Sequence, residues 1–111
     1  MNLLIQIMLN QGPLGFHGGD SRAIALLLYL AARQGNHDTT WVGRKTICRD
    51  LGWDPQRRSR FDAVVEELED RKLLKVTTSL IPNTKTIAPH YDCRPTLEVL
   101  KGLDLPKQEE E

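Results

Sequence analysis

The stretch between residues 39 and 75 constrains the fold most, because a short amphipathic segment, a tight turn and a longer amphipathic segment follow one another there. In the short segment, Ile47, Cys48 and Leu51 fall on one helical face. Gly52 then stands where the end of a helix needs a residue that tolerates left-handed backbone angles. A helix of about eight residues is unstable alone, so this one must dock its apolar face on the rest of the fold.

The longer segment is predicted to be a helix beginning at Pro55. Asp54 is a good N-cap acceptor, and proline is favoured at the first helical position. Apolar residues then recur at i, i+3, i+4 and i+7, which predicts one buried stripe. They are Phe61, Val64, Val65 and Leu68. Two helices joined by a tight turn over residues 42–72 have the layout of a helix-turn-helix.

Charge on the longer helix is arranged against the helix dipole. Arginines stand at its positive N-terminal end and acidic residues follow toward its negative end, and each such charge costs about 0.3–1 kcal/mol. The residues are Arg57, Arg58 and Arg60, followed by Glu66, Glu67, Glu69 and Asp70. The N-terminal part of a DNA-reading helix enters the major groove, so the pattern favours DNA contact. The alternative is a solvated helix in which Arg58 pairs with Asp62 and Glu67 with Arg71.

The chain of 111 residues has room for one domain, and its formal net charge is zero. The net charge therefore does not support DNA binding, and the argument for it depends on how charged residues are distributed along the chain. Between Trp41 and Arg60 there are six basic and two acidic residues, whereas acidic residues predominate from Glu98 onward. The chain is thus electrically polarised.

The sequence contains no pattern that is typical of catalysis, metal binding or a membrane span. The two cysteines, Cys48 and Cys93, form no spaced ligand set, and the three histidines have no i, i+4 partner. We therefore expect no enzyme activity, no metal and no cofactor. No apolar stretch reaches the ~18 residues of a membrane span, and no secretion signal is present, so we expect a cytoplasmic protein without membrane contact.

The first third of the chain is predicted to hold a strand, a loop and a helix. Residues 2–9 form a short run rich in leucine and isoleucine, which we interpret as a strand. The glycine-rich segment 11–19 is a loop. A helix should run from Asp20 or Ser21 to about Gln34, and it is apolar nearly all round, so it should be buried on more than one side. Trp41 and Trp53, which bracket the short amphipathic segment, are interpreted as core anchors.

The last third changes from a helical period to a period of two. Residues 74–93 are predicted to form a β-hairpin with its turn near Asn83, and Pro89 marks the returning strand as an edge strand. Residues 94–111 form a C-terminal extension, with a short helix starting near Pro95 and an acidic tail. Glu109, Glu110 and Glu111 are either simply solvated or fold back over the basic segment.

In this order of elements the chain resembles the winged helix-turn-helix superfamily, in particular the modules of phage and plasmid replication-initiation and regulatory proteins. The residues that carry the resemblance are SRAIALLLYLAAR, WVGRKTICRDLGW, FDAVVEELEDRKLLKV and Tyr91. The resemblance implies an α+β fold of three helices and a C-terminal hairpin wing over residues 1–93, here with an additional N-terminal strand. It also implies that the helix after the turn reads the major groove.

Carried onto this sequence, the resemblance and the charge pattern give a set of DNA-binding candidates. Gln56, Arg57, Arg60 and Ala63 would face the groove, with Arg58 beside them. Arg44, Lys45, Thr46 and Arg49 would contact the backbone, and Lys85 would contact DNA from the tip of the hairpin. The expected partners are double-stranded DNA and a second copy of the chain, since apolar surface is in surplus on the first helix and on the segment 2–9. The alternative is a protein-interaction module, such as an adaptor or inhibitor of a host protein.

Overall fold

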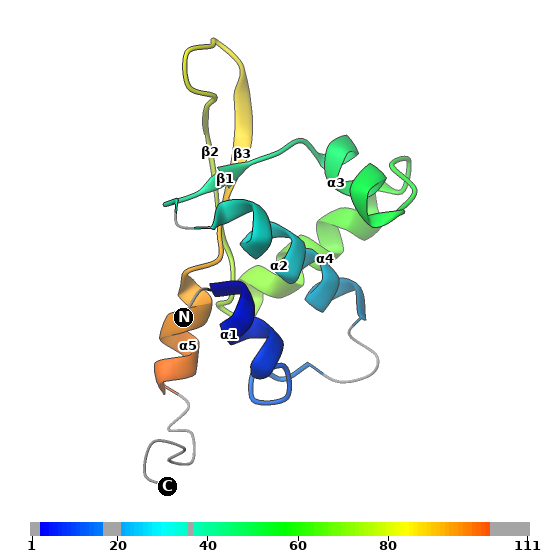
Figure 1. Ribbon diagram of the computed structural model, residues 1–111. Coiled ribbons are helices and arrows are strands. Elements are labelled where there is room, and N and C mark those ends of the chain that lie inside the picture. Colours follow the sequence, from blue (N-terminus) through cyan, green and yellow to red (C-terminus); the bar gives the residue numbers. More distant parts are fainter. Residues whose placement is uncertain (1–2, 17–20, 36, 103–111) are drawn as a thin grey trace, which may run out of the picture.

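The computed structural model describes residues 3–16, 21–35 and 37–102. Within these residues the chain has an α+β fold, with helices gathered on one side of a small antiparallel sheet (Figure 1). The helices are α1 (Leu3–Leu9), α2 (Ser21–Gln34), α3 (Arg44–Leu51), α4 (Arg58–Asp70) and α5 (Pro95–Gly102). The strands are β1 (Thr40–Trp41), β2 (Lys75–Leu80) and β3 (Ile87–Asp92).

Helix α2 is the centre of the core, as its all-round apolar sequence predicts. Leu26, Leu27 and Leu30 are fully buried, and Ile24, Leu28 and Tyr29 on its other sides are partly buried. Helices α1 and α4 and strand β3 all pack on it. A helix with apolar residues on several faces is stable only when it is surrounded in this way.

The N-terminal segment is a helix, and the prediction of a strand over residues 2–9 is wrong. In α1, Ile7 is fully buried and Leu4 is partly buried, whereas Ile5, Met8 and Leu9 are exposed. Burial at a spacing of three residues follows the period of a helix rather than that of a strand. A short run apolar at nearly every position cannot be assigned by periodicity alone, and leucine and methionine are good helix formers.

The loop after α1 contributes to the core in its described part, residues 10–16. Leu14 and Phe16 are buried in it. Arg71, at the end of α4, fixes this loop: its Nη1 donates to the carbonyl of Gly15 at 3.1 Å, and its guanidinium lies 5.0 Å from the centre of the Phe16 ring. The same arginine pairs with Glu67 at 2.8 Å.

The sheet has the order β1–β3–β2, so β3 is its central strand. The expectation that Pro89 marks an edge strand is therefore wrong, although the reason behind it holds locally. Strand β1 pairs only with Tyr91 and His90, and Pro89 lies beyond its end. On the other side, Pro89 stands opposite Thr78 of β2. A residue without an N–H is accommodated because β1 does not extend alongside it.

Helix α4 begins at Arg58 rather than at Pro55. The Asp54 carboxylate, expected to cap a helix, accepts the N–H of Gln56 at 2.9 Å, and the carbonyl of Asp54 accepts the N–H of Arg57 at 3.1 Å. Asp54 therefore closes a tight turn, which is the alternative use of this side chain in local structure. Pro55 lies inside that turn.

Helix α5 joins the C-terminal extension to the rest of the fold. Thr96 is fully buried, and its Oγ1 donates to the carbonyl of Leu73 at 2.8 Å. Leu100 is buried, and α5 also packs against α1. The predicted short helix from Pro95 is thus confirmed, while the acidic tail, Glu109 to Glu111, lies outside the described residues.

Candidate functional site

The end of α3, at the start of the turn to α4, is built as the sequence predicts. Gly52 has a φ of 75°, in the left-handed region that favours glycine. Its N–H donates to the carbonyl of Arg49 at 3.3 Å, and the N–H of Trp53 donates to the carbonyl of Cys48 at 2.8 Å. These two bonds are those of a Schellman motif, which ends a helix and redirects the chain.

Helix α3 is docked by buried side chains and by a hydrogen bond to α2. Ile47 and Cys48 are buried, as predicted. Beside this buried face, the Tyr29 hydroxyl of α2 donates to Asp50 Oδ2 at 2.5 Å. This hydrogen bond, together with Arg49 beside it, lowers the pKa of the Asp50 carboxyl, and burial and the bond to Asp50 raise the pKa of Tyr29. A short helix is thereby held in a fixed place.

The two tryptophans, Trp41 and Trp53, differ in how deeply they are buried. Trp53 is partly buried and meets Phe61 edge to face, with ring centroids 6.4 Å apart. It is a core anchor as expected. The same expectation for Trp41 is wrong, because its side chain is 45% exposed. Trp41 lies on the two-residue strand β1, whose burial alternates from Thr40 inward to Trp41 outward.

The candidates on α3 lie along one short helix. Lys45 and Arg49 are exposed, and Arg44 and Thr46 are half-buried. Arg44 Nη1 donates to the carbonyl of Pro55 and so ties the start of α3 to the turn before α4.

The candidates around the start of α4 are all exposed. They are Gln56, Arg57, Arg58 and Arg60. Helix α4 has no acidic residue in its first turn and no basic residue in its last turn, so its charge does oppose the helix dipole. Arg57 pairs with Asp54 at 3.6 Å and Arg58 pairs with Asp62 at 3.8 Å. Both ion pairs expected for a solvated helix, Arg58 with Asp62 and Glu67 with Arg71, are therefore present, but a pair between exposed side chains such as that of Arg58 stabilises little.

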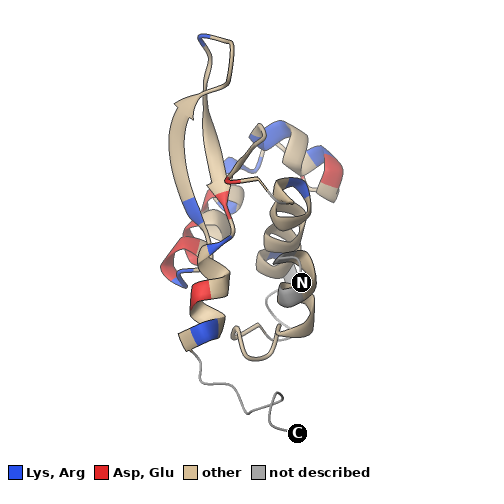
Figure 2. Cartoon of the chain, turned by 60° about the vertical axis from the view of Figure 1, so that its left-hand side comes forward, with Lys and Arg blue, Asp and Glu red and all other residues tan. Residues whose placement is uncertain are grey.

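Lys85 lies in the turn of the hairpin, residues 81–86, and is exposed. Figure 2 shows basic colouring at the tip of the hairpin and on α3, and acidic colouring along α4. The hairpin turn is held by Thr84, whose Oγ1 donates to the carbonyl of Ile81 at 2.9 Å and accepts the N–H of Thr86 at 3.1 Å. The basic candidates for DNA contact thus stand at two places, α3 with the start of α4, and the hairpin tip.

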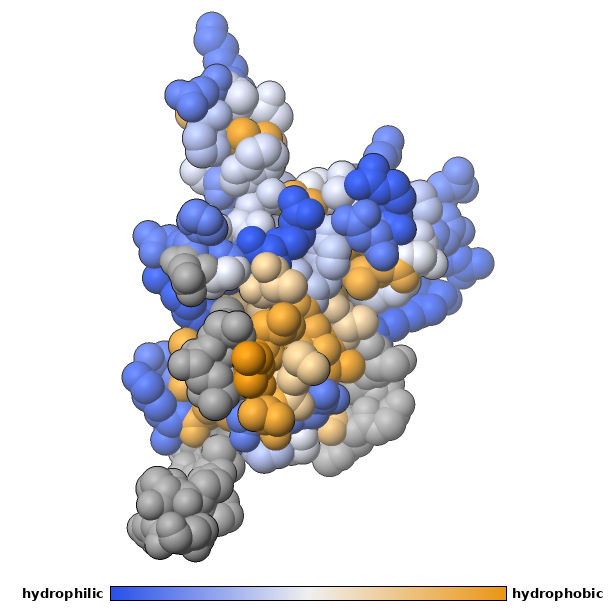
Figure 3. Space-filling model, in the orientation of Figure 1, coloured by the Kyte–Doolittle hydropathy of each residue, from blue (hydrophilic) through white to orange (hydrophobic). Residues whose placement is uncertain are grey.

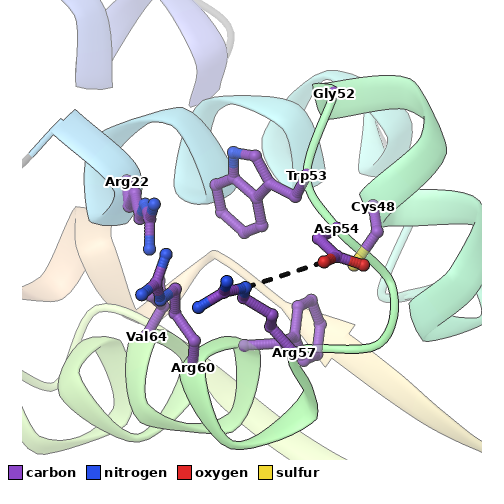
Figure 4. Close-up of a pocket in the computed structure, with 9 residues that line it drawn as sticks. Arg22, Cys48, Gly52, Trp53, Asp54, Arg57, Arg60 and Val64 are labelled. Carbon is purple, nitrogen blue, oxygen red and sulfur yellow. Dashed lines mark ion pairs between the residues drawn. The ribbon is translucent and has the colours of Figure 1, made fainter.

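A pocket of about 360 Å³ opens between α2, the α3–α4 turn and α4. Its apolar lining is Cys48, Trp53, Phe61 and Val64, and its charged lining is Arg22, Asp54, Arg57 and Arg60 (Figure 4). We call this the arginine pocket. Sequence reasoning missed Arg22, because it lies on α2, far from Arg57 in the chain, and only tertiary packing brings the two together.

Comparisons with protein-family models, with curated proteins and with solved structures were made for this chain. None of the three gave a match. Across residues 3–16, 21–35 and 37–102, no group of three or more His, Cys, Asp and Glu side chains is placed to hold a metal ion. None of the helices in this described part has the length and apolar character needed to cross a membrane.

Proposed function

We propose that this chain is a small sequence-specific binder of double-stranded DNA, with a winged helix-turn-helix formed by α2, α3, α4 and the β2–β3 hairpin. The placement of positive charge carries the proposal. Arg57, Arg58 and Arg60 stand at the N-terminal end of α4, where their charge opposes the helix dipole. Arginines that destabilise the helix in this way are expected where they contact a ligand such as DNA.

Each element has a role in this proposal. The start of α4 enters the major groove and presents Arg57 and Arg60 to base edges or phosphates. Lys45 and Arg49 on α3 contact the phosphate backbone, and Lys85 contacts it from the hairpin tip. The protein acts as a homodimer on a two-fold related site, as a phage or plasmid transcriptional regulator or a replication accessory factor in the cytoplasm.

The test is fluorescence anisotropy with random duplex DNA and with a fragment from the region of its own gene, at several salt concentrations. Arg57→Ala and Arg60→Ala should each weaken binding by about 1–3 kcal/mol if these residues read bases. Affinity should fall steeply with salt, because phosphate contacts release counterions. Lys101→Ala, which removes an exposed charge from α5, is the matched control.

Unchanged affinity in both arginine variants would exclude the groove assignment. Equal loss on every sequence would reassign the arginines to phosphate contacts. An absence of binding even at low salt would exclude the proposal as a whole.

A protein-interaction module is the second candidate, and exposed apolar residues on α1 favour it. Ile5, Met8 and Leu9 are 41%, 52% and 69% exposed. Figure 3 shows apolar side chains gathered over this part of the molecule. A folded protein that binds no DNA at low salt but forms a defined complex with a host protein would establish this alternative.

A further inference from the structure

The arginine pocket has two features that contact with a duplex does not require: a volume of ligand size and an aromatic wall. Its volume of about 360 Å³ falls within the range of small-ligand sites, about 300–1,000 Å³. Cys48 and Phe61 are buried in its wall, and Trp53 is partly buried. The apolar part of the lining is therefore held by the core, whereas the charged lining residues are exposed.

The charges around the pocket are not balanced by the described residues that line it. Three arginines face one carboxylate, and that carboxylate, Asp54, pairs with Arg57 at 3.6 Å. The side chains of Arg22 and Arg60 come from different helices and point toward one another (Figure 4). Like charges repel at such positions, so a bound dianion would relieve the repulsion.

A phosphate monoester has the charge that suits this pair. It carries about −1.5 to −2 at pH 7, which matches two guanidinium groups that lack an acidic partner in the pocket lining. Guanidinium groups also bind phosphate oxygens through paired N–H donors. A ligand with a single carboxylate would neutralise only one of the two guanidinium groups.

The other wall of the pocket is suited to a flat ring. The Trp53 indole lies on the side opposite the start of α4 (Figure 4), and Phe61 packs against it edge to face, with ring centroids 6.4 Å apart. Rings of this kind bind other planar groups by offset stacking or edge contacts. The arginines and the indole are close enough to line one pocket.

We propose that the arginine pocket binds a nucleotide through its phosphate monoester, with Arg22 and Arg60 on the phosphate and Trp53 against the base. The same chemistry is offered by a free mononucleotide and by the 5′-phosphorylated end of a strand. A phosphodiester within a duplex has a single charge and no accessible base face, so this site is distinct from the groove contact. Occupation of the pocket would also engage Arg60 and so compete with duplex; this effect alone rests on the proposed function.

The experiment is a titration of Trp53 fluorescence in the Trp41→Phe variant, in which Trp53 is the remaining tryptophan. The probes are adenosine 5′-monophosphate, adenosine, inorganic phosphate, and a trinucleotide with and without a 5′-phosphate. Saturable quenching is expected with the mononucleotide or the phosphorylated trinucleotide. Arg22→Ala should weaken it about tenfold. Arg33→Ala, which removes an arginine from the same helix outside the pocket, is the matched control.

Several results would overturn the proposal. They are no saturable change with either phosphorylated probe, equal affinity in Arg22→Ala, adenosine binding as tightly as its monophosphate, or inorganic phosphate binding as tightly as the nucleotide. Tighter binding of the phosphorylated trinucleotide assigns the site to strand ends, and tighter binding of the mononucleotide assigns it to free nucleotides. No duplex is present, so failure here and failure of DNA binding are separate results.

Discussion

At the scale of single residues, Gln34 connects more of the structure than any charged candidate does. Its side chain is fully buried at the end of α2. Nε2 lies 3.1, 2.9 and 2.9 Å from the carbonyl oxygens of His37 and Asp38 and from Asp92 Oδ1, so its two hydrogens are shared among three acceptors, and Oε1 accepts the N–H of Cys93 at 2.8 Å. One amide thus joins α2, the following turn and the end of β3.

Replacement of Gln34 by leucine should lower the free energy of unfolding by about 1–3 kcal/mol, because the buried N–H of Cys93 loses its acceptor. Urea denaturation followed by circular dichroism measures this. Gln11→Ala, which removes one exposed hydrogen bond to the carbonyl of Met8, is the control. Equal midpoints for the two variants would contradict a structural role for the Gln34 amide.

Asp92 makes the stability depend on pH. Burial by itself would raise the pKa of its carboxyl, but hydrogen bonds from Arg94 and Gln34 outweigh this and lower the pKa below the ordinary 3.8. The unfolded chain therefore takes up the proton first, so the stabilisation is full above the ordinary pKa and is lost as pH falls through the lowered one.

Thermal melts of the Asp92→Asn variant from neutral pH into the acid range should show this. The difference from the unaltered protein should be largest at neutral pH and should shrink in acid. Asp70→Asn, at the exposed end of α4, removes the same charge without this network. A difference that stays constant with pH would show that the Asp92 carboxylate contributes no pH-dependent stability.

At the scale of elements, the turn between α3 and α4 depends on the backbone of Gly52. A Cβ there would meet no neighbouring atom within 4 Å, so a side chain at this position would be strained only by the backbone φ of 75°. Gly52→Ala should therefore destabilise by about 1 kcal/mol. Gly12→Ala, also at an open position and without a positive φ, is the control, and denaturation midpoints compare the two. An equal effect at both positions would show that the left-handed conformation is not the cause.

Elements whose signal is local could be predicted from the sequence, and those decided by tertiary contact could not. Gly52 predicts the end of α3. The change from a helical period of apolar residues to a period of two predicts the end of α4 and the start of β2. The Asp54–Pro55 pair fits a helix start and a turn equally well, and the run Leu3–Leu9 fits a strand and a helix. For the site, the exposure of Arg57 and Arg60 followed from the helical period, whereas the placement of Arg22 beside them depends on how α2 packs.

At the scale of the whole molecule, α1 leaves apolar surface exposed on top of a well-packed core. If the chain forms a homodimer through this surface, Met8→Lys and Leu9→Lys should shift it toward monomer, since a charge would have to be buried in the contact. Sedimentation at several concentrations measures the change. Ile87→Lys, at the exposed end of the hairpin, is the matched control. A monomer in every variant, including the unaltered protein, would exclude the dimer under these conditions.

The proline in the central strand has a consequence for the motions of the molecule. In the register of β1 with β3, the next residue of β3 to be paired after His90 would be Pro89, and it has no amide hydrogen to offer. The ladder between these strands stops there, and the outer half of the hairpin is held by β2–β3 pairs alone, as far as Leu80 opposite Ile87. Amide hydrogens near that end should exchange with solvent deuterium much faster than those near Tyr91, because the outer half can open without disturbing the core.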